Sequence, residues 1–117
     1  MFNFLRSSTP KLSLADVIAK AAAGEITLLD VREKAELQAS GTAKGALHIP
    51  LSMVPLKANP KGPDFDKRLS GKPLAVFCAA GARAGQAVQV LQGFGHEAVN
   101  IGGFGQWTAA GGPVSRV

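Results

Sequence analysis

The sequence contains a single cysteine among its 117 residues, so an intrachain disulfide is excluded. A lone thiol is typical of a reducing compartment, and we expect a cytoplasmic protein. No apolar run reaches the length of a membrane span, and residues 1–10 lack the basic start and apolar stretch of a signal peptide. From these absences we expect neither a secreted disulfide-stabilised domain nor a membrane partner.

Aromatic residues are also scarce, because the chain has no tyrosine and one tryptophan. The thirteen basic residues give a net charge of +5, but they are scattered and form no stripe. A nucleic-acid-binding surface needs such a stripe or aromatic side chains on which bases stack. We therefore expect a solvated basic surface that attracts small anions, and no nucleic-acid partner.

The length of the chain suits one domain with a single core. We expect residues 1–10 to be a loose leader and residues 11–117 to form the domain. Apolar runs of strand length alternate with segments of helical periodicity. The expected strands are 26–31, 46–50, 74–77 and 98–101, and the expected helices are 14–23, 33–39, 83–92 and a short one that carries Trp107. This alternation predicts an α/β fold with a mostly parallel central sheet flanked by helices on both faces, whereas residues 51–73 are expected to be irregular apart from one turn at 65–69.

The only thiol of the chain comes at the carboxyl end of an expected strand. Cys78 follows the apolar run 74–77, and a helical pattern begins at Arg83. Between them lie only small residues: Ala79, Ala80, Gly81 and Ala82. Backbone N–H groups in such a tight loop converge on one point, and the positive end of the following helix adds to their effect. The loop would then stabilise the thiolate, which is the nucleophilic form. The alternative is that Cys78 is a small buried apolar residue, the usual role of a lone cysteine.

A second polar group, Asp30-Val31-Arg32, ends the buried strand 26–31. The carboxyl ends of parallel strands meet at one edge of a sheet, where α/β proteins place their sites. We therefore expect Asp30 and Arg32 to lie near Cys78. We interpret them as a polar network that supports the neighbouring site.

Three segments carry a family resemblance when they are taken in order. They are Asp30-Val31-Arg32-Glu33 with Glu36 and residues 45–51, the loop Cys78-Ala79-Ala80-Gly81-Ala82-Arg83, and residues 102–107 with Gly112-Pro113-Val114. Together they resemble the signature of the rhodanese family of sulfurtransferases in its single-domain form. The resemblance implies that the domain 11–117 has a rhodanese-like fold.

The resemblance also implies a ping-pong transfer of sulfane sulfur. Cys78 would take the sulfur from thiosulfate, a persulfide or a polysulfide, become a persulfide, and pass the sulfur to a thiol or to cyanide. The loop residues that would bind the substrate and the persulfide are Ala79, Ala80, Gly81, Ala82 and Arg83. No metal or other cofactor is implied. The expected partners are small sulfur donors and thiol acceptors, with a protein acceptor as a further alternative.

Two positions beside the thiol depart from the family pattern. Ala79 stands where the family often has a basic residue, and Ala84 stands where it often has serine or threonine. Both changes remove polar side chains from the surroundings of Cys78. We therefore expect thiosulfate to be a poorer donor than persulfides or polysulfides.

Other functions and roles stay open at this stage. A carrier or binding module would accept sulfur at Cys78 only from a protein partner. A cysteine-dependent phosphatase is disfavoured, because phosphatases of similar fold place the loop arginine one position later than Arg83. That arginine either contacts an anionic donor or, as we favour, pairs with an acidic residue and braces the loop. His48 and His96 are too isolated for a metal site and are expected to be structural or exposed.

Overall fold

A four-stranded sheet forms the centre of the computed structural model, which describes residues 12–117. The expected leader, residues 1–10, lies outside the described residues. The strands are β1 (Thr27–Asp30), β3 (Leu47–His48), β4 (Leu74–Cys78) and β5 (Ala98–Gly103). Their order is β3-β1-β4-β5, and every pairing between neighbours is parallel. The expected strands therefore pair as a parallel sheet, and β4 lies between two neighbours.

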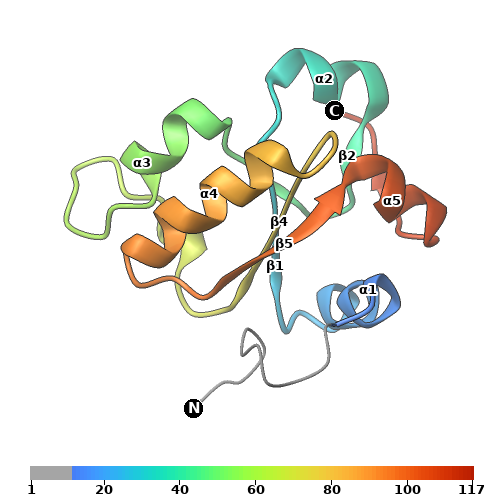
Figure 1. Ribbon diagram of the computed structural model, residues 1–117, viewed down its shortest axis with the longest axis horizontal. Helices are drawn as coiled ribbons and strands as arrows, with labels where there is room; N and C mark the ends of the chain where they lie inside the picture. Colours follow the sequence, from blue (N-terminus) through green and yellow to red (C-terminus); the bar gives the residue numbers. More distant parts are fainter. Residues whose placement is uncertain (1–11) are drawn as a thin grey trace.

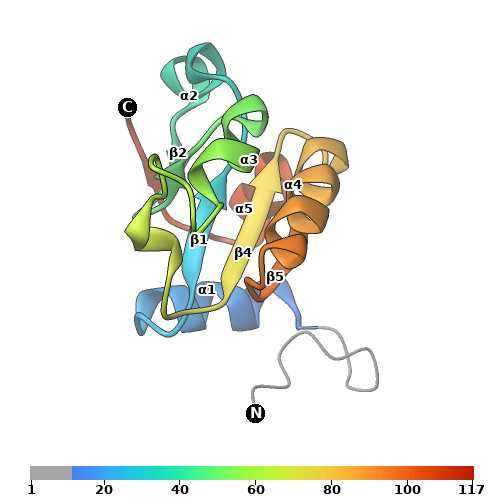
Figure 2. The same cartoon turned by 90° about the vertical axis from the view of Figure 1, so that its left-hand side faces the viewer.

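Helices cover both faces of this sheet, as Figures 1 and 2 show. Helices α1 (Leu14–Ala22) and α5 (Phe104–Ala109) lie on one face, α3 (Val54–Lys57) and α4 (Ala82–Gly93) lie on the other, and α2 (Lys34–Ser40) lies beyond the carboxyl ends of the strands. Helix α1 begins at Ser13, whose hydroxyl accepts a hydrogen bond from the Asp16 N–H while the Asp16 carboxylate accepts one from the Ser13 N–H. This reciprocal cap satisfies two N–H groups that a helix start leaves without partners. In the part of the chain that the structure describes, no helix is long and apolar enough to cross a membrane.

The core divides into two layers because successive side chains of a strand point to opposite faces. All five residues of β4 are buried. Val76 and Cys78 pack with residues of α3 and α4, whereas Ala75 and Phe77 pack with residues of α1 and α5. The thiol therefore belongs to the layer that α4 covers.

Two features differ from the sequence-based expectation. Residues 51–53 form a short 3-10 helix that leads directly into α3, in a segment expected to be irregular. Pro55 lies in the first turn of α3, where a proline costs no hydrogen bond. A second, antiparallel sheet joins β2 (Thr42–Ala43) to β6 (Val114–Ser115). Strands of two residues are too short to show a hydrophobic period, so the sequence does not reveal them.

Residues 112 and 113, which follow α5, are held by contacts with Trp107. Trp107 is buried, and its indole Nε1–H donates a hydrogen bond of 2.9 Å to the carbonyl oxygen of Pro113. Gly112 lies so close to the indole ring that a Cβ atom there would collide with it. The segment 112–115 can therefore reach β2 and complete the second sheet.

Candidate active site

Cys78 is the last residue of β4 and lies at the carboxyl edge of the central sheet. Only 1% of the Cys78 surface is exposed to solvent. The sulfur accepts hydrogen bonds from two backbone N–H groups, Gly81 N at 3.0 Å and Ala84 N at 3.4 Å. The thiol is therefore enclosed by the following loop and by the first turn of α4.

Gly81 gives the loop its shape. It is the N-cap of α4 and has a φ of +106°, a left-handed conformation that residues with a Cβ atom rarely adopt. This conformation directs the Gly81 N–H back toward the sulfur. Ala79, Ala80 and Ala82 are exposed, so the outer edge of the loop presents only methyl groups and backbone. Charge stabilisation at this site comes mainly from peptide dipoles.

These dipoles change the acidity of the thiol. Burial raises the pKa of Cys78, because a buried thiolate loses its hydration. The N–H groups of Ala84, Ala80, Gly81 and Arg83 act in the opposite direction, and their combined effect is larger. The net result is a Cys78 pKa below that of an ordinary thiol. The loop thus favours the nucleophilic form.

Arg83 forms a two-pronged ion pair with Glu36 of α2. Its Nη1 lies 2.6 Å from Oε1 and its Nη2 lies 2.9 Å from Oε2 of that carboxylate. The pair lowers the Glu36 pKa to about 2 and raises the Arg83 pKa. Both terminal nitrogens of the guanidinium group are therefore engaged with a partner 47 positions away in the sequence. This is the geometry of the bracing alternative, because the pair ties α2 to the start of α4.

Asp30 and Arg32 form a second ion pair, which is buried. The Arg32 Nη2 lies 2.8 Å from the Asp30 Oδ2. The same nitrogen donates to the carbonyl oxygen of Gly41 at 2.8 Å, and the Thr42 hydroxyl donates to Asp30 at 2.8 Å. The network therefore joins the end of β1 to the end of α2 and to β2.

The Asp30–Arg32 network lies on the opposite face of the sheet from the thiol, whereas we expected it beside Cys78. The strand ends are neighbours as expected, since Asp30 pairs in register with Phe77. Leu29 and Cys78 share one core layer, however, so the next side chain along β1, Asp30, points to the opposite face. There Arg32 lies 4.5 Å from the centre of the Phe104 ring. Asp30 and Arg32 thus support α2, which carries Glu36, rather than the thiol itself.

Strand β5 contributes two residues that the sequence analysis did not single out for the site, Asn100 within the strand and Gly103 at its carboxyl end. The Asn100 side chain donates to the Gly81 carbonyl oxygen at 2.9 Å and accepts from the Gly102 N–H at 2.8 Å. Gly103 packs so tightly against the loop that a Cβ atom would collide with the carbonyl oxygen of Ala79. The Gly102-Gly103 pair was visible as a motif, but its contact with the loop depends on the neighbouring register of β4 and β5.

The two histidines bind backbone carbonyl groups. The Nε2 of His48 lies 2.7 Å from the Arg32 oxygen, and the Nε2 of His96 lies 2.8 Å from the Ala58 oxygen. Both rings thus have structural contacts. Across residues 12–117, no three His, Cys, Asp or Glu side chains gather as they would around a metal ion.

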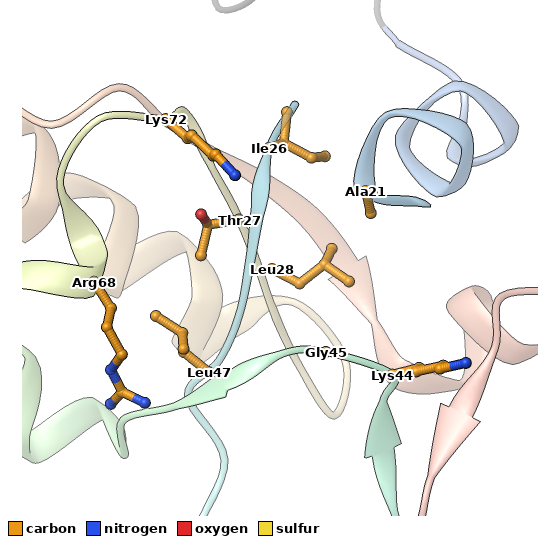
Figure 3. Close-up of a pocket in the computed structure, with 9 residues that line it drawn as sticks. All are labelled: Ala21, Ile26, Thr27, Leu28, Lys44, Gly45, Leu47, Arg68 and Lys72. Atoms are coloured by element: carbon orange, nitrogen blue, oxygen red, sulfur yellow. The ribbon is translucent and has the colours of Figure 1, made fainter. Parts of the chain in front are cut away.

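A hollow of about 310 Å³ lies at the other end of the sheet, beside the start of β1 and the edge strand β3. Three cationic side chains line it: Lys44, Arg68 and Lys72. Figure 3 shows that the Lys44 amine points away from the other two. The Arg68 guanidinium is bound to the Asp66 carboxylate, with Nη2 and Oδ2 2.6 Å apart. The hollow therefore does not focus its positive charge on one point, and it lies apart from the thiol loop.

Comparison with known proteins identifies the family. The family model of the rhodanese-like domain matches residues 13–110. A search of curated proteins gave no match. Among solved structures, a human single-domain sulfurtransferase is similar with a TM-score of 0.66 and 32% identity, over 86% of this chain and 96% of the other. A rhodanese-related protein from Thermoplasma volcanium has a TM-score of 0.70 and 30% identity, over 92% and 98% of the two chains.

A third similar structure has a different description. It is a protein of unknown function from Rhodopseudomonas palustris, described as a possible tyrosine phosphatase. Its TM-score is 0.80 at 30% identity, and the match covers 93% of this chain and 86% of the other. The family model spans most of the 117 residues, and its range includes the cysteine loop 78–83 together with Glu36, Asn100 and Gly103, which contact that loop. The chain therefore belongs to the rhodanese-like domain family.

Proposed function

We propose that the protein is a sulfurtransferase that carries sulfane sulfur as a persulfide on Cys78. The observation that supports this most directly is the Cys78 sulfur within 3.0 Å of the Gly81 N–H and within 3.4 Å of the Ala84 N–H. N–H groups that converge on a sulfur atom stabilise the thiolate before reaction and the persulfide anion after it. The loop N–H groups already favour the Cys78 thiolate, so no separate side chain is needed as a base to deprotonate the thiol.

In the first half-reaction the Cys78 thiolate attacks the outer sulfur of the donor. A new S–S bond forms between Cys78 and that sulfur, while the S–S bond of the donor breaks. The leaving group takes the electron pair of the broken bond and departs as a thiolate, or as sulfite when the donor is thiosulfate. Cys78 is then a persulfide, and no net oxidation or reduction of the pair has occurred.

In the second half-reaction the acceptor attacks the outer sulfur of the persulfide. A thiolate acceptor becomes a persulfide and cyanide becomes thiocyanate, while the Cys78 thiolate leaves with the electron pair of the broken S–S bond. Arg83 takes no direct part in this scheme, because its guanidinium group is bound to Glu36. The acceptors in this proposal are small thiols or a protein thiol, and a chain with a single cysteine suits a reducing compartment such as the cytoplasm.

The description of one similar structure as a possible tyrosine phosphatase makes phosphate-ester hydrolysis the second candidate. That reaction needs a cationic group of the protein that stabilises the negative charge of the phosphoryl group during its transfer. The arginine available in this loop, Arg83, already binds Glu36 through both terminal nitrogens. The loop also places Arg83 one position closer to Cys78 than phosphatases of similar fold do. Both features favour sulfur transfer.

Intact-mass spectrometry tests the proposal directly. The protein is incubated with a low-molecular-weight persulfide and should gain the mass of one sulfur atom, whereas Cys78→Ser should gain none. Addition of cyanide should then remove the sulfur and release thiocyanate. Failure of the parent protein to gain sulfur would refute the proposal. A stable persulfide that no small acceptor discharges would indicate a carrier instead, and aryl phosphate turnover that Cys78→Ser abolishes would indicate a phosphatase.

A further inference from the structure

The shortest hydrogen bond to the Cys78 sulfur comes from a glycine. Gly81 N lies 3.0 Å from the sulfur, and Gly81 is also the residue with the left-handed backbone at the start of α4. Glycine has more backbone freedom than any other residue, so its N–H direction is fixed only if its neighbours hold it. The site therefore depends on what restrains Gly81.

The Asn100 side chain supplies a restraint from the neighbouring strand. Its Nδ2 donates to the Gly81 carbonyl oxygen at 2.9 Å, across 19 positions of sequence. The same oxygen accepts the first helical hydrogen bond of α4, from Gly85 N at 3.0 Å. A Cβ atom at Gly85 would lie 3.5 Å from the Asn100 Nδ2, so the amide lies along this first turn. The two hydrogen bonds hold the Gly81 carbonyl from two directions.

The orientation of the Asn100 amide follows from its two partners. The Gly102 N–H can only donate and lies 2.8 Å from Oδ1, while the Gly81 carbonyl can only accept and faces Nδ2. The bond to Gly102 is a local turn of a kind that a serine hydroxyl also forms. The bond to Gly81 is the long-range one, and it requires the amide.

We propose that Asn100 is a positioning residue of the thiol loop, and that its side-chain amide holds the Gly81 carbonyl so that the Gly81 N–H stays directed at the Cys78 sulfur. The idea deepens the proposed function and rests on it for the reaction, because the same N–H would hold the persulfide. The Gly81 N–H and the Gly81 carbonyl belong to the two peptide planes that meet at its Cα atom, so holding the carbonyl restricts how far the plane of the N–H can turn. Without the bond from Asn100, the Gly81 N–H would point at the Cys78 sulfur for a smaller fraction of the time.

The test uses Asn100→Ser, which keeps an acceptor for the Gly102 N–H but loses the donor to Gly81. The matched control is Gln92→Ala. Gln92 also donates from its side chain to a backbone oxygen of the same strand, Ala98 O at 3.1 Å, but Gln92 lies in the last turn of α4, away from the thiol loop. Neither substitution alters the charged groups near the loop, which are Arg83 of α4 and the carboxylates Glu33 and Glu36 at the start of α2.

The primary measurement is the rate of alkylation of Cys78 by iodoacetamide as a function of pH, without any sulfur donor. In Asn100→Ser the midpoint should move up by about half a pH unit, because one hydrogen bond to the thiolate is weakened. Gln92→Ala should keep the parent midpoint. The kcat/KM for sulfur transfer should fall roughly three- to tenfold in Asn100→Ser, with a melting temperature close to that of Gln92→Ala. Asn100→Thr, which also keeps a hydroxyl acceptor, lacks the amide donor and adds no charge, should shift the midpoint as far and serves if Asn100→Ser does not fold.

An alkylation midpoint in Asn100→Ser equal to that of the parent would overturn the proposal. An equal shift in Gln92→Ala would also overturn it, because the effect would then come from general loss of stability. The alkylation assay needs no sulfur transfer, so the two ideas can fail separately. If the parent protein transfers no sulfur but the alkylation midpoint still moves up in Asn100→Ser, the positioning role is supported and the proposed function is refuted.

Discussion

The charge at the edge of the loop should decide which sulfur donors the protein uses. Ala79 is exposed beside the thiol, and the one guanidinium group of the loop is bound to Glu36. Thiosulfate carries two negative charges and would meet only backbone dipoles and the diffuse positive field of the protein. We therefore expect a small persulfide to be the better donor, and we expect Ala79→Arg to raise the use of thiosulfate selectively.

The exposure of Ala79 sets the size of the effect. A buried charge-assisted hydrogen bond contributes ~1.5–3 kcal/mol. An exposed pair contributes only ~0.2–1 kcal/mol, because water screens it and the long side chain loses freedom. Position 79 lies at the exposed rim, so we take about 1 kcal/mol for a new arginine. This corresponds to a roughly fivefold increase in kcat/KM for thiosulfate.

The assay compares kcat/KM for thiosulfate and for a low-molecular-weight persulfide in the parent, in Ala79→Arg and in Ala79→Gln. The glutamine variant adds a side chain without charge and should leave the ratio of the two values near that of the parent. Salt should reduce the gain in Ala79→Arg, because the interaction is exposed. If the parent already prefers thiosulfate, or if Ala79→Arg and Ala79→Gln change the ratio equally, the argument from missing charge is wrong.

Three further predictions concern the loop and its braces. The alkylation rate of Cys78 should reach half its maximum at a lower pH than that of a model thiol peptide, because the loop N–H groups lower its pKa; identical profiles would show that the loop does not activate the thiol. Gly103→Ala should abolish sulfur transfer, since the new Cβ collides with the Ala79 carbonyl, whereas Gly105→Ala meets open space and should keep full activity; active Gly103→Ala would show that the loop tolerates displacement. The pKa of Glu36 is lowered from 4.5 to about 2, so its ion pair stabilises the fold above pH 4.5 and loses this effect as the pH falls toward 2. Glu36→Gln should therefore lower the free energy of unfolding by about 1 kcal/mol at neutral pH, after a discount for the partly exposed pair, and by less at pH 3; chemical denaturation at the two pH values measures this, and a deficit that does not shrink at low pH would contradict it.

The strand, the loop and the helix around Cys78 could be predicted because their signals are local. An apolar run, a set of small residues and a helical period follow one another directly in residues 74–92. The parallel sheet follows from the alternation of such segments. The cap of α1 is likewise local, since Ser13 and Asp16 are three positions apart.

The contacts between distant segments could not be predicted in the same way. Arg83 was expected to pair with an acidic residue, but only the fold brings Glu36 to it. Strands buried on both faces read as continuous apolar runs, so the sequence does not tell which face Asp30 takes. The contribution of Asn100 depends on the alignment of β4 with β5, where Val76 pairs with Asn100.

The loop that holds the thiol has almost no side chains of its own to fix its shape. Its geometry comes from its neighbours: Glu36 on one side, and Asn100 and Gly103 on the other. The Asp30–Arg32 pair acts one step further away, because it secures the end of α2. A loop braced from outside can expose its backbone N–H groups fully to the sulfur, and its exposed alanines remain free to vary. Changes in donor preference should therefore arise at the rim, whereas changes in thiol acidity should arise at the braces.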